Sequence, residues 1–275
     1  MARTSIFELE QRFDIDKEFD KIFDDYLQRR DLEIKDGSSY RNGSMMDFIN
    51  MFMEDFPLAG SSRTYTEFFE ERNISLMKTS DKKKTLEFYL YQLELINNFI
   101  SWTLGDDTPS FDQSCKNQVV LLISKMDLFL EKCNYERINL GYNETYEMKI
   151  IKIVKRDADV DSVIPIINPD FMQDVLSYLD FRIENNLVEK ENIIKRLYNY
   201  LEKEKFILNV DPNKKFFSDT KRVLNYCRHF RENKLSNEEM ILLLDKAFYM
   251  FLHLIRTPMV KQYLEDTKNL ITDKD

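Results

Sequence analysis

Apolar residues recur every three or four positions along most of the chain, the spacing that places them on one face of an α-helix. The two longest stretches with this spacing run from Leu86 to Leu104 and from Phe111 to Cys133. Shorter stretches predict helices over residues 16–30, 44–56, 64–77, 171–185, 189–208, 218–233 and 236–257, with Ser44 as the cap of the second of these. The hydrophobic pattern therefore predicts a mainly α fold.

One stretch departs from this period. Between residues 135 and 155 polar and apolar side chains alternate, as in Thr145, Glu147 and Lys149 against Tyr146, Met148 and Ile150, and this alternation predicts a single small β-hairpin. Gly141-Tyr142-Asn143 predicts a turn before the alternating stretch, and the adjacent Ile150 and Ile151 suggest a β-bulge. The polar stretch 33–43 is interpreted as a loop, and residues 157–168, with Pro165, as an extended linker.

The change of period divides the chain into three parts. We expect an N-terminal helical domain over 1–134, the β-hairpin and linker over 135–168, and a C-terminal helical bundle over 169–275. In the last part, Ser236 and Glu239 have the spacing of a capping box, so they predict the start of a helix. That helix is apolar on nearly all sides from Met240 to Ile255, which predicts that it is the most buried one, and Pro258 is expected to interrupt or kink it.

Charge is unevenly distributed along the chain. The 275 residues carry a formal net charge of −9, and this overall charge argues against binding of nucleic acid. Residues 1–60 hold 14 acidic and 8 basic side chains, whereas residues 190–234 hold 12 basic and 6 acidic ones. A local basic segment can meet phosphates in an acidic protein, but a pair of solvated helices rich in lysine gives the same count. The charge pattern leaves both interpretations open.

Several classes of chemistry have no support in the sequence. The three cysteines are widely separated on apolar stripes, which is typical of reduced thiols in a cytoplasmic protein. Residues 1–10 lack the apolar core of a signal peptide, and no apolar run is long enough to span a bilayer, so we expect no membrane association. The chain has two histidines, no Cys-x-x-Cys or His-x-x-x-His spacing and no glycine-rich phosphate loop, so we expect no metal and no cofactor.

The candidate catalytic residues lie between Ser218 and Asn233. Wound as a helix, this stretch places its apolar residues on one face, and a neighbouring face carries Arg222, Asn225, His229 and Asn233. Arg222 and His229 are seven positions apart, so they lie two turns apart and nearly in line. The other histidine, His253, is interpreted as a hydrogen-bonded core residue of the last helix, with Arg256 near the C-terminus of that helix.

Arg222 and His229, with six residues between them on a helix of a C-terminal bundle, resemble the motif of the HEPN family. The resemblance covers roughly residues 170–257. It implies a helical, often dimeric domain that cleaves RNA without a metal in toxin–antitoxin, abortive-infection or phage-defence systems. It further implies that His229 takes the proton of the 2′-hydroxyl and Arg222 holds the phosphate, with Asn225, Arg228 and Asn233 as substrate-binding residues.

The sequence therefore supports two candidate functions. The first is a metal-independent RNA-cleaving effector of a bacterial defence or toxin system, acting as a homodimer through Arg222 and His229. The second is a non-catalytic helical interaction protein, an adaptor or antitoxin-like partner, suggested by the Met-rich and aromatic stripes and the acidic first 60 residues. The first predicts that both side chains open into a groove that solvent reaches. The second predicts an exposed apolar patch on the N-terminal half.

Overall fold

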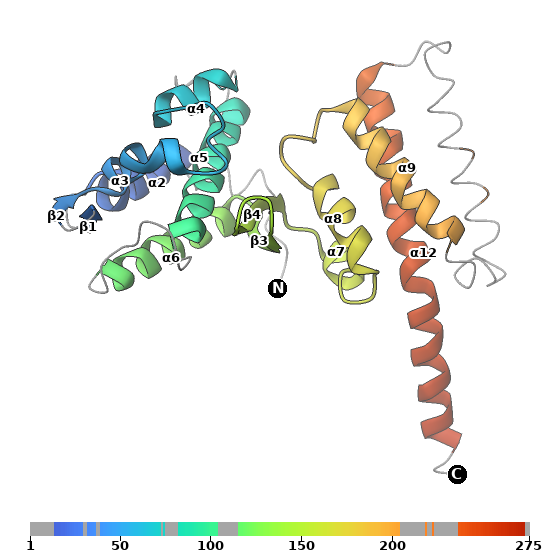
Figure 1. The fold of residues 1–275 in the computed structure, drawn as a ribbon. Helices are drawn as coiled ribbons and strands as arrows, with labels where there is room; N and C mark the ends of the chain where they lie inside the picture. The colour runs from blue at the N-terminus through green and yellow to red at the C-terminus, as the bar shows by residue number, and fades with distance from the viewer. Residues whose placement is uncertain are drawn as a thin grey trace. The chain divides into compact units, whose positions relative to one another are not determined.

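The structure is a computed structural model that describes residues 14–29, 32–36, 39–72, 74, 82–103, 115–203, 218, 222 and 236–272. The chain forms two compact units, Met1–Lys155 and Arg156–Asp275 (Figure 1). The predicted β-hairpin belongs to unit 1, and the stretch interpreted as a linker belongs to unit 2. The mainly α fold class is confirmed.

Unit 1 combines helices with two antiparallel hairpins. Its helical elements are α2 (Ile15–Ile22), the π-helical turn η1 (Phe23–Leu27), α3 (Met45–Phe52), the 3-10 turn η2 (Met53–Asp55), α4 (Tyr65–Glu71), α5 (Lys82–Thr103) and α6 (Lys116–Lys132). Its strands are β1 (Leu32–Asp36), β2 (Ser39–Gly43), β3 (Tyr135–Asn143) and β4 (Met148–Lys155). Ser44 caps α3 as the sequence predicts, because its side chain accepts from the Asp47 N–H and Asp47 bonds back to the Ser44 N–H.

Helix α5 forms the centre of the unit 1 core. Every residue from Gln92 to Ile100 is buried, so this helix is covered on all sides along its second half. Aromatic side chains of α3 and of the turn after it reach α5, with the Phe48 and Phe99 rings 5.6 Å apart and the Phe56 and Trp102 rings 5.6 Å apart. Aromatic contacts at such distances stabilise a core beyond the area they bury.

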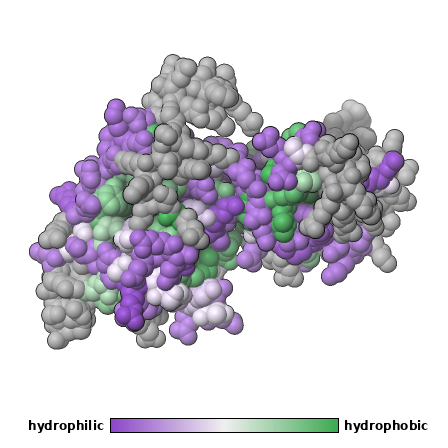
Figure 2. Space-filling model, turned by 90° about the horizontal axis from the view of Figure 1, so that it is seen from above, coloured by the Kyte–Doolittle hydropathy of each residue, from purple (hydrophilic) through white to green (hydrophobic). Residues whose placement is uncertain are grey.

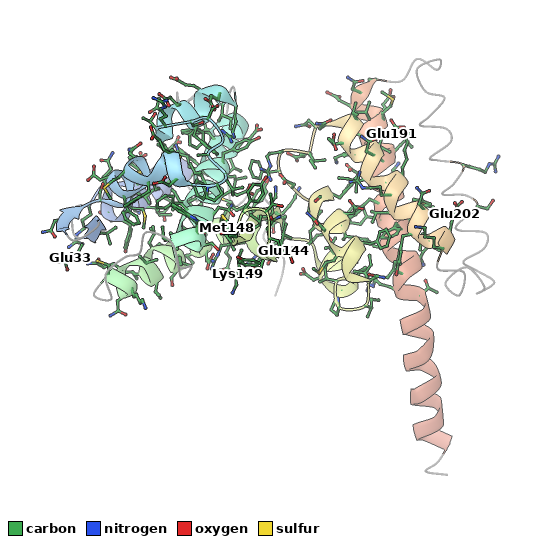
Figure 3. All side chains as sticks on the ribbon, viewed as in Figure 1. Glu33, Glu144, Met148, Lys149, Glu191 and Glu202 are labelled. Atoms are coloured by element: carbon green, nitrogen blue, oxygen red, sulfur yellow. The ribbon has the colours of Figure 1, made fainter. Side chains whose placement is uncertain are left out.

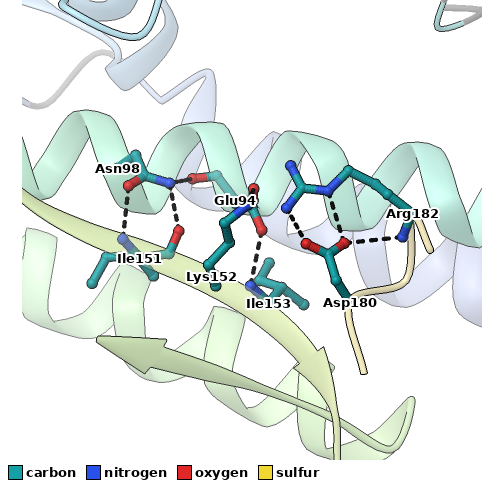
Figure 4. Close-up of polar contacts among 7 residues, drawn as sticks. All are labelled: Glu94, Asn98, Ile151, Lys152, Ile153, Asp180 and Arg182. Carbon is teal, nitrogen blue, oxygen red and sulfur yellow. Dashed lines mark hydrogen bonds and ion pairs between the residues drawn. The ribbon is translucent and has the colours of Figure 1, made fainter. Parts of the chain in front are cut away.

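Polar side chains of α5 pair with the outer edge of strand β4 (Figure 4). Asn98 accepts a hydrogen bond from the Ile151 N–H at 2.8 Å and donates one to the Ile151 carbonyl at 2.7 Å. Glu94 accepts from the Ile153 N–H at 2.9 Å, and the Ser101 hydroxyl donates to the Lys149 carbonyl at 2.8 Å. The three side chains lie on one face of α5. They bond the backbone groups at the free edge of β4, as a third strand of the sheet would.

The hairpins correct three details predicted from the sequence. Residues 33–43, interpreted as a loop, contain most of the β1–β2 hairpin. In the second hairpin Gly141-Tyr142-Asn143 belongs to β3, and the turn is formed by residues 144–147. The register shift lies in β3 between Asn139 and Tyr142, opposite Ile150, so the irregularity is where the sequence suggests but in the partner strand. Gly141 has φ +94°, a conformation that glycine adopts without strain.

Unit 2 is helical in the part that the structure describes. Its helices are α7 (Ala158–Val163), α8 (Pro169–Tyr178), α9 (Leu187–Lys203) and α12 (Asn237–Thr272). The first of these corrects the sequence analysis, because residues 158–163 form a helix inside the predicted linker. Asp157 starts that helix by accepting hydrogen bonds from the Asp159 and Val160 N–H groups.

Helix α12 packs on α9 and α7, and its inward side chains are fully buried at Leu244, Phe248 and Phe251. Ser236 and Glu239 form the predicted capping box. The interruption expected at Pro258 is absent: one helix continues to Thr272, past the end of α9 (Figure 1). A proline removes one backbone hydrogen bond and crowds the preceding turn, and here the helix continues beyond it.

Candidate functional site

The predicted RNA-cleaving site lies mostly outside the described residues. Arg222 is described, as a helical residue with an exposed side chain. Asn225, Arg228, His229 and Asn233 are outside the described residues, so the pairing of Arg222 with His229 stays a prediction. The second histidine, His253, is exposed on α12 and is not the core residue that the sequence suggests. Arg256 is likewise not at a helix end, and it forms an ion pair with Asp159 of α7 at 2.7 Å.

The described cysteines contribute to structure. Neither Cys115 nor Cys133 forms a disulfide, in agreement with the reduced thiols expected. Cys115 is buried, and its sulfur accepts a hydrogen bond from the Glu33 N–H of β1, a residue labelled in Figure 3. Burial raises the pKa of the Cys133 thiol to about 12, so that thiol stays protonated and weakly nucleophilic at neutral pH.

A partly buried ionic cluster joins three helices of unit 2. Lys190 of α9 is 4% exposed, and its ammonium group pairs with Asp245 of α12. The Tyr178 hydroxyl of α8 donates to the same Asp245 oxygen at 2.8 Å, and the Lys190 nitrogen lies 4.8 Å from the centre of the Tyr178 ring. The Tyr178 ring in turn stacks on Phe248. The cluster holds α8, α9 and α12 together, and it buries the Lys190 amine while the Asp245 side chain stays 35% exposed.

A groove lies in unit 1, between α2 and η1 on one side and α6 on the other. It consists of two hollows of about 250 Å³ and about 70 Å³ that share Asp25 and Tyr26 in their linings. The α6 side of the larger hollow is formed by Lys125, Leu128, Phe129 and Lys132, and that of the smaller one by Gln118, Val119, Leu121 and Leu122. We call the two hollows together the α6 groove.

The α6 side of the groove alternates apolar and cationic groups. Leu121, Lys125, Leu128 and Lys132 follow one another at spacings of four, three and four residues, so they form a single stripe along the helix. The opposite side adds Lys21 and Arg29. Glu18 and Asp25 of the same side balance these two cations, so the groove combines apolar groups with a net positive charge that comes from Lys125 and Lys132 of α6.

Glu18 neutralises part of this charge. It accepts a hydrogen bond from Lys21 at 2.7 Å and another from Lys132 at 3.2 Å, and these contacts tie α2 to α6. The hydrogen bond from Lys21, followed by that from Lys132, holds the pKa of Glu18 below its usual 4.5. Lys125 forms no hydrogen bond or ion pair with any residue that the structure describes. Its ammonium group is the one in the groove most available to an incoming carboxylate.

Helix α6 also exposes large apolar side chains. Val120, Leu121 and Leu128 are 61%, 47% and 45% exposed, and Leu121 and Leu128 line the groove. Hydrophobic residues likewise reach the surface between hydrophilic ones on the face that Figure 2 shows. Large apolar groups gathered beside a hollow are typical of protein-binding surfaces.

Val119, Leu122, Met126 and Phe129 follow the three- and four-residue apolar spacing of this helix, and all four are buried. That spacing does not identify Leu121 and Leu128 as groove residues. A signal was present, because residues 119–123 are five consecutive apolar residues, more than one buried stripe can accommodate. The pattern indicates an excess of apolar side chains but not which neighbours leave them uncovered.

Comparison of the chain with protein-family models, with curated proteins and with solved structures finds no match. Among the described residues there is no group of three or more His, Cys, Asp or Glu side chains arranged to hold a metal ion. In the same part of the chain, no helix has both the length and the apolarity needed to cross a bilayer.

Proposed function

We propose that this chain is a helical interaction protein that binds a protein partner through the α6 groove. The observation that carries the proposal is the exposure of Leu121 and Leu128 along two adjoining hollows. It is the kind of surface that the interaction hypothesis expects on the N-terminal half of the chain. Burying these side chains against a partner removes apolar area from water, which is the main driving force of protein association.

The test is a capture experiment with a groove variant. The full-length wild type, the Leu121→Asp/Leu128→Asp variant and a Leu242→Asp control are immobilised in parallel and exposed to lysate of the source organism. Leu242 is a matched control because it is also exposed on a helix but belongs to α12 of unit 2 and lines neither hollow. A protein retained by the wild type and the control, but lost with the groove variant, is then purified and titrated against all three.

We expect the groove variant to bind the purified protein at least tenfold more weakly, since two carboxylates in an apolar contact carry a large desolvation cost. Equal binding by the wild type and the groove variant would remove the proposal. So would the absence of any protein whose retention depends on the groove. Fluorescence of Trp102, the only tryptophan and a buried residue of unit 1, checks that each variant is folded.

RNA cleavage by Arg222 and His229 is a second candidate function. One observation favours it: Arg222 lies in a helical conformation with its side chain exposed, as phosphate binding requires. The resemblance to the HEPN family assigns proton abstraction to His229, phosphate binding to Arg222 and substrate contacts to Asn225, Arg228 and Asn233. In this proposal the protein acts as a homodimer in a defence or toxin system.

Cleavage of labelled RNA in the presence of a chelator tests this candidate. Arg222→Ala and His229→Ala are each expected to abolish cleavage while helical content, measured by circular dichroism, is unchanged. Lys246→Ala serves as the control, because Lys246 is an exposed cation of the same unit on α12. Cleavage at the wild-type rate by either the Arg222 or the His229 variant would exclude the mechanism.

A further inference from the structure

The shape of the α6 groove restricts what it can hold. Its lining follows α6 from Gln118 to Lys132, which at 1.5 Å per residue corresponds to about 21 Å. Its long walls are the helices α2 and α6, whose backbone N–H and C=O groups are already bonded within each helix, while Leu32 of β1 and Met45 of α3 add to the lining of the smaller hollow. An extended peptide would find few backbone partners on such walls, whereas a helix satisfies its own backbone. The groove therefore suits a helix of about 14 residues, the length that spans it at the same rise per residue.

The chemistry of the groove restricts the sequence of that helix. Leu121 and Leu128 are seven residues apart and offer contacts to apolar side chains two turns apart on a facing helix. The lining carries the four cations Lys21, Arg29, Lys125 and Lys132 against the two carboxylates Glu18 and Asp25. This positive balance occurs in a chain whose formal net charge is −9. Acidic groups beside the apolar stripe of the partner complement it.

We infer that the occupant of the α6 groove is an acidic amphipathic α-helix of a protein partner. The inference rests on the proposed partner-binding function and names the class of ligand. Apolar residues of the bound helix lie along the exposed Leu121 and Leu128. Its carboxylates lie beside Lys125 and beside the Lys21–Glu18–Lys132 group.

Three synthetic peptides of about 15 residues, one groove length, test the inference in a titration of the full-length chain by fluorescence anisotropy. The first has leucines at helical positions i, i+3, i+7 and i+11 flanked by glutamates. The second has lysine in place of every glutamate, and the third is a scrambled form of the first. We expect the acidic peptide to bind, with an affinity that falls as salt is added, and the other two to bind at least tenfold more weakly.

Charge reversal in the groove gives the sharper result. Lys125→Glu is expected to weaken binding of the acidic peptide roughly fivefold and to strengthen binding of the basic one, because attraction and repulsion exchange places. Lys149→Glu is the matched control, since Lys149 is an exposed lysine of unit 1 on the β3–β4 hairpin (Figure 3), outside the groove. It is expected to bind both peptides as the wild type does.

The outcomes separate this inference from the function on which it rests. Equal binding of the acidic and basic peptides, or unchanged binding by the Lys125→Glu variant, would overturn the inference that the bound helix is acidic. If that happens while the capture experiment still finds a partner that depends on Leu121 and Leu128, the groove binds proteins of another class. If both experiments fail, the partner-binding function fails with the inference.

Discussion

At the scale of single residues, the most informative side chains are buried polar ones. Asn98 is 4% exposed, and its amide both accepts from and donates to the backbone of Ile151. The adjacent Asn97 is equally buried, but its side-chain nitrogen donates to the Leu93 carbonyl of its own helix, and its oxygen has no hydrogen-bond partner among the described residues. Two asparagines side by side therefore have different roles, one bridging to a strand and the other bonded mainly within its helix.

Asn98→Leu is expected to destabilise unit 1 by about 2–4 kcal/mol, because leucine can neither donate to the Ile151 carbonyl nor accept from the Ile151 N–H and leaves both buried groups unpaired. Chemical denaturation followed by Trp102 fluorescence measures the free energy of unfolding of this unit selectively. Asn97→Leu is the matched control and is expected to cost less, since the bonds it loses go to the Leu93 carbonyl within α5 and to the Met126 sulfur. A larger loss at position 97 than at 98 would contradict the role given to Asn98.

The Lys190–Asp245 pair gives a second prediction at this scale. Asp245→Asn leaves the buried Lys190 ammonium without its counter-charge and is expected to destabilise unit 2 by about 3 kcal/mol. Adding Lys190→Met to that variant is expected to restore part of the loss, because the buried charge is then gone and the new amide oxygen at position 245 still accepts from Tyr178. Thermal unfolding monitored by circular dichroism compares the two variants. A double variant less stable than the single one would show that the pair is not the controlling interaction.

At the scale of elements, hydrogen bonds and ion pairs join helices whose sequences give no sign of being neighbours. Glu18 connects α2 to α6 through Lys132, at a separation of 114 residues. Tyr249 and Arg256 connect α12 to Asp157 and Asp159 at the start of α7. Burial, followed by the carboxylate acceptor, raises the pKa of the Tyr249 hydroxyl, so that hydroxyl stays a donor at neutral pH.

The Glu18 contacts predict a pH dependence for unit 1. Because the folded-state pKa of Glu18 is lowered, its stabilisation is fully present above about pH 4.5 and is lost as the pH falls through the folded-state pKa. Glu18→Gln is expected to lower the free energy of unfolding at neutral pH by no more than about 1 kcal/mol, since the carboxylate is partly solvated. Denaturant titrations over a range of pH should show the difference from the wild type vanish in acid. Glu144→Gln, at an exposed turn position, should leave the pH profile unchanged.

At the scale of the whole molecule, each unit has its own core. In unit 1 the aromatic groups of α3 and of the turn after it meet α5, and the outer edge of β4 is satisfied by side chains of α5. In unit 2 the buried faces of α8, α9 and α12 meet around the Lys190–Asp245 pair. The division falls between Lys155 and Arg156, directly after β4.

This division predicts that residues 1–155 fold alone. The fragment is expected to show the same Trp102 denaturation midpoint as the full chain, because Trp102 packs on the rings of Phe56 and Phe99, both of which lie within it. The comparison uses the same denaturant and readout for both proteins. A broad transition, or a midpoint clearly below that of the full chain, would show that unit 1 depends on unit 2.

The sequence was sufficient for local structure. Apolar spacing predicted most of the described helices, alternation predicted the β3–β4 hairpin, and serines at the right positions predicted the caps at Ser44 and Ser236. These features depend on residues within a few positions of one another, so the local sequence is enough to predict them. The β1–β2 hairpin and α7 were not predicted because their segments are short and polar and their pattern resembles that of loops.

The candidate groove was decided by tertiary structure. Residues 119–123 indicate apolar side chains, but the exposure of Leu121 and the burial of Leu122 depend on which faces of α6 the helix α2 and the turn η1 cover. In the same way, Asn97 and Asn98 are the same residue type at adjacent positions of α5. Only Asn98 forms hydrogen bonds to β4, because β4 lies on its side of the helix. Local periodicity fixes which elements form, whereas the packing of elements distant in the chain fixes which side chains remain available to a partner.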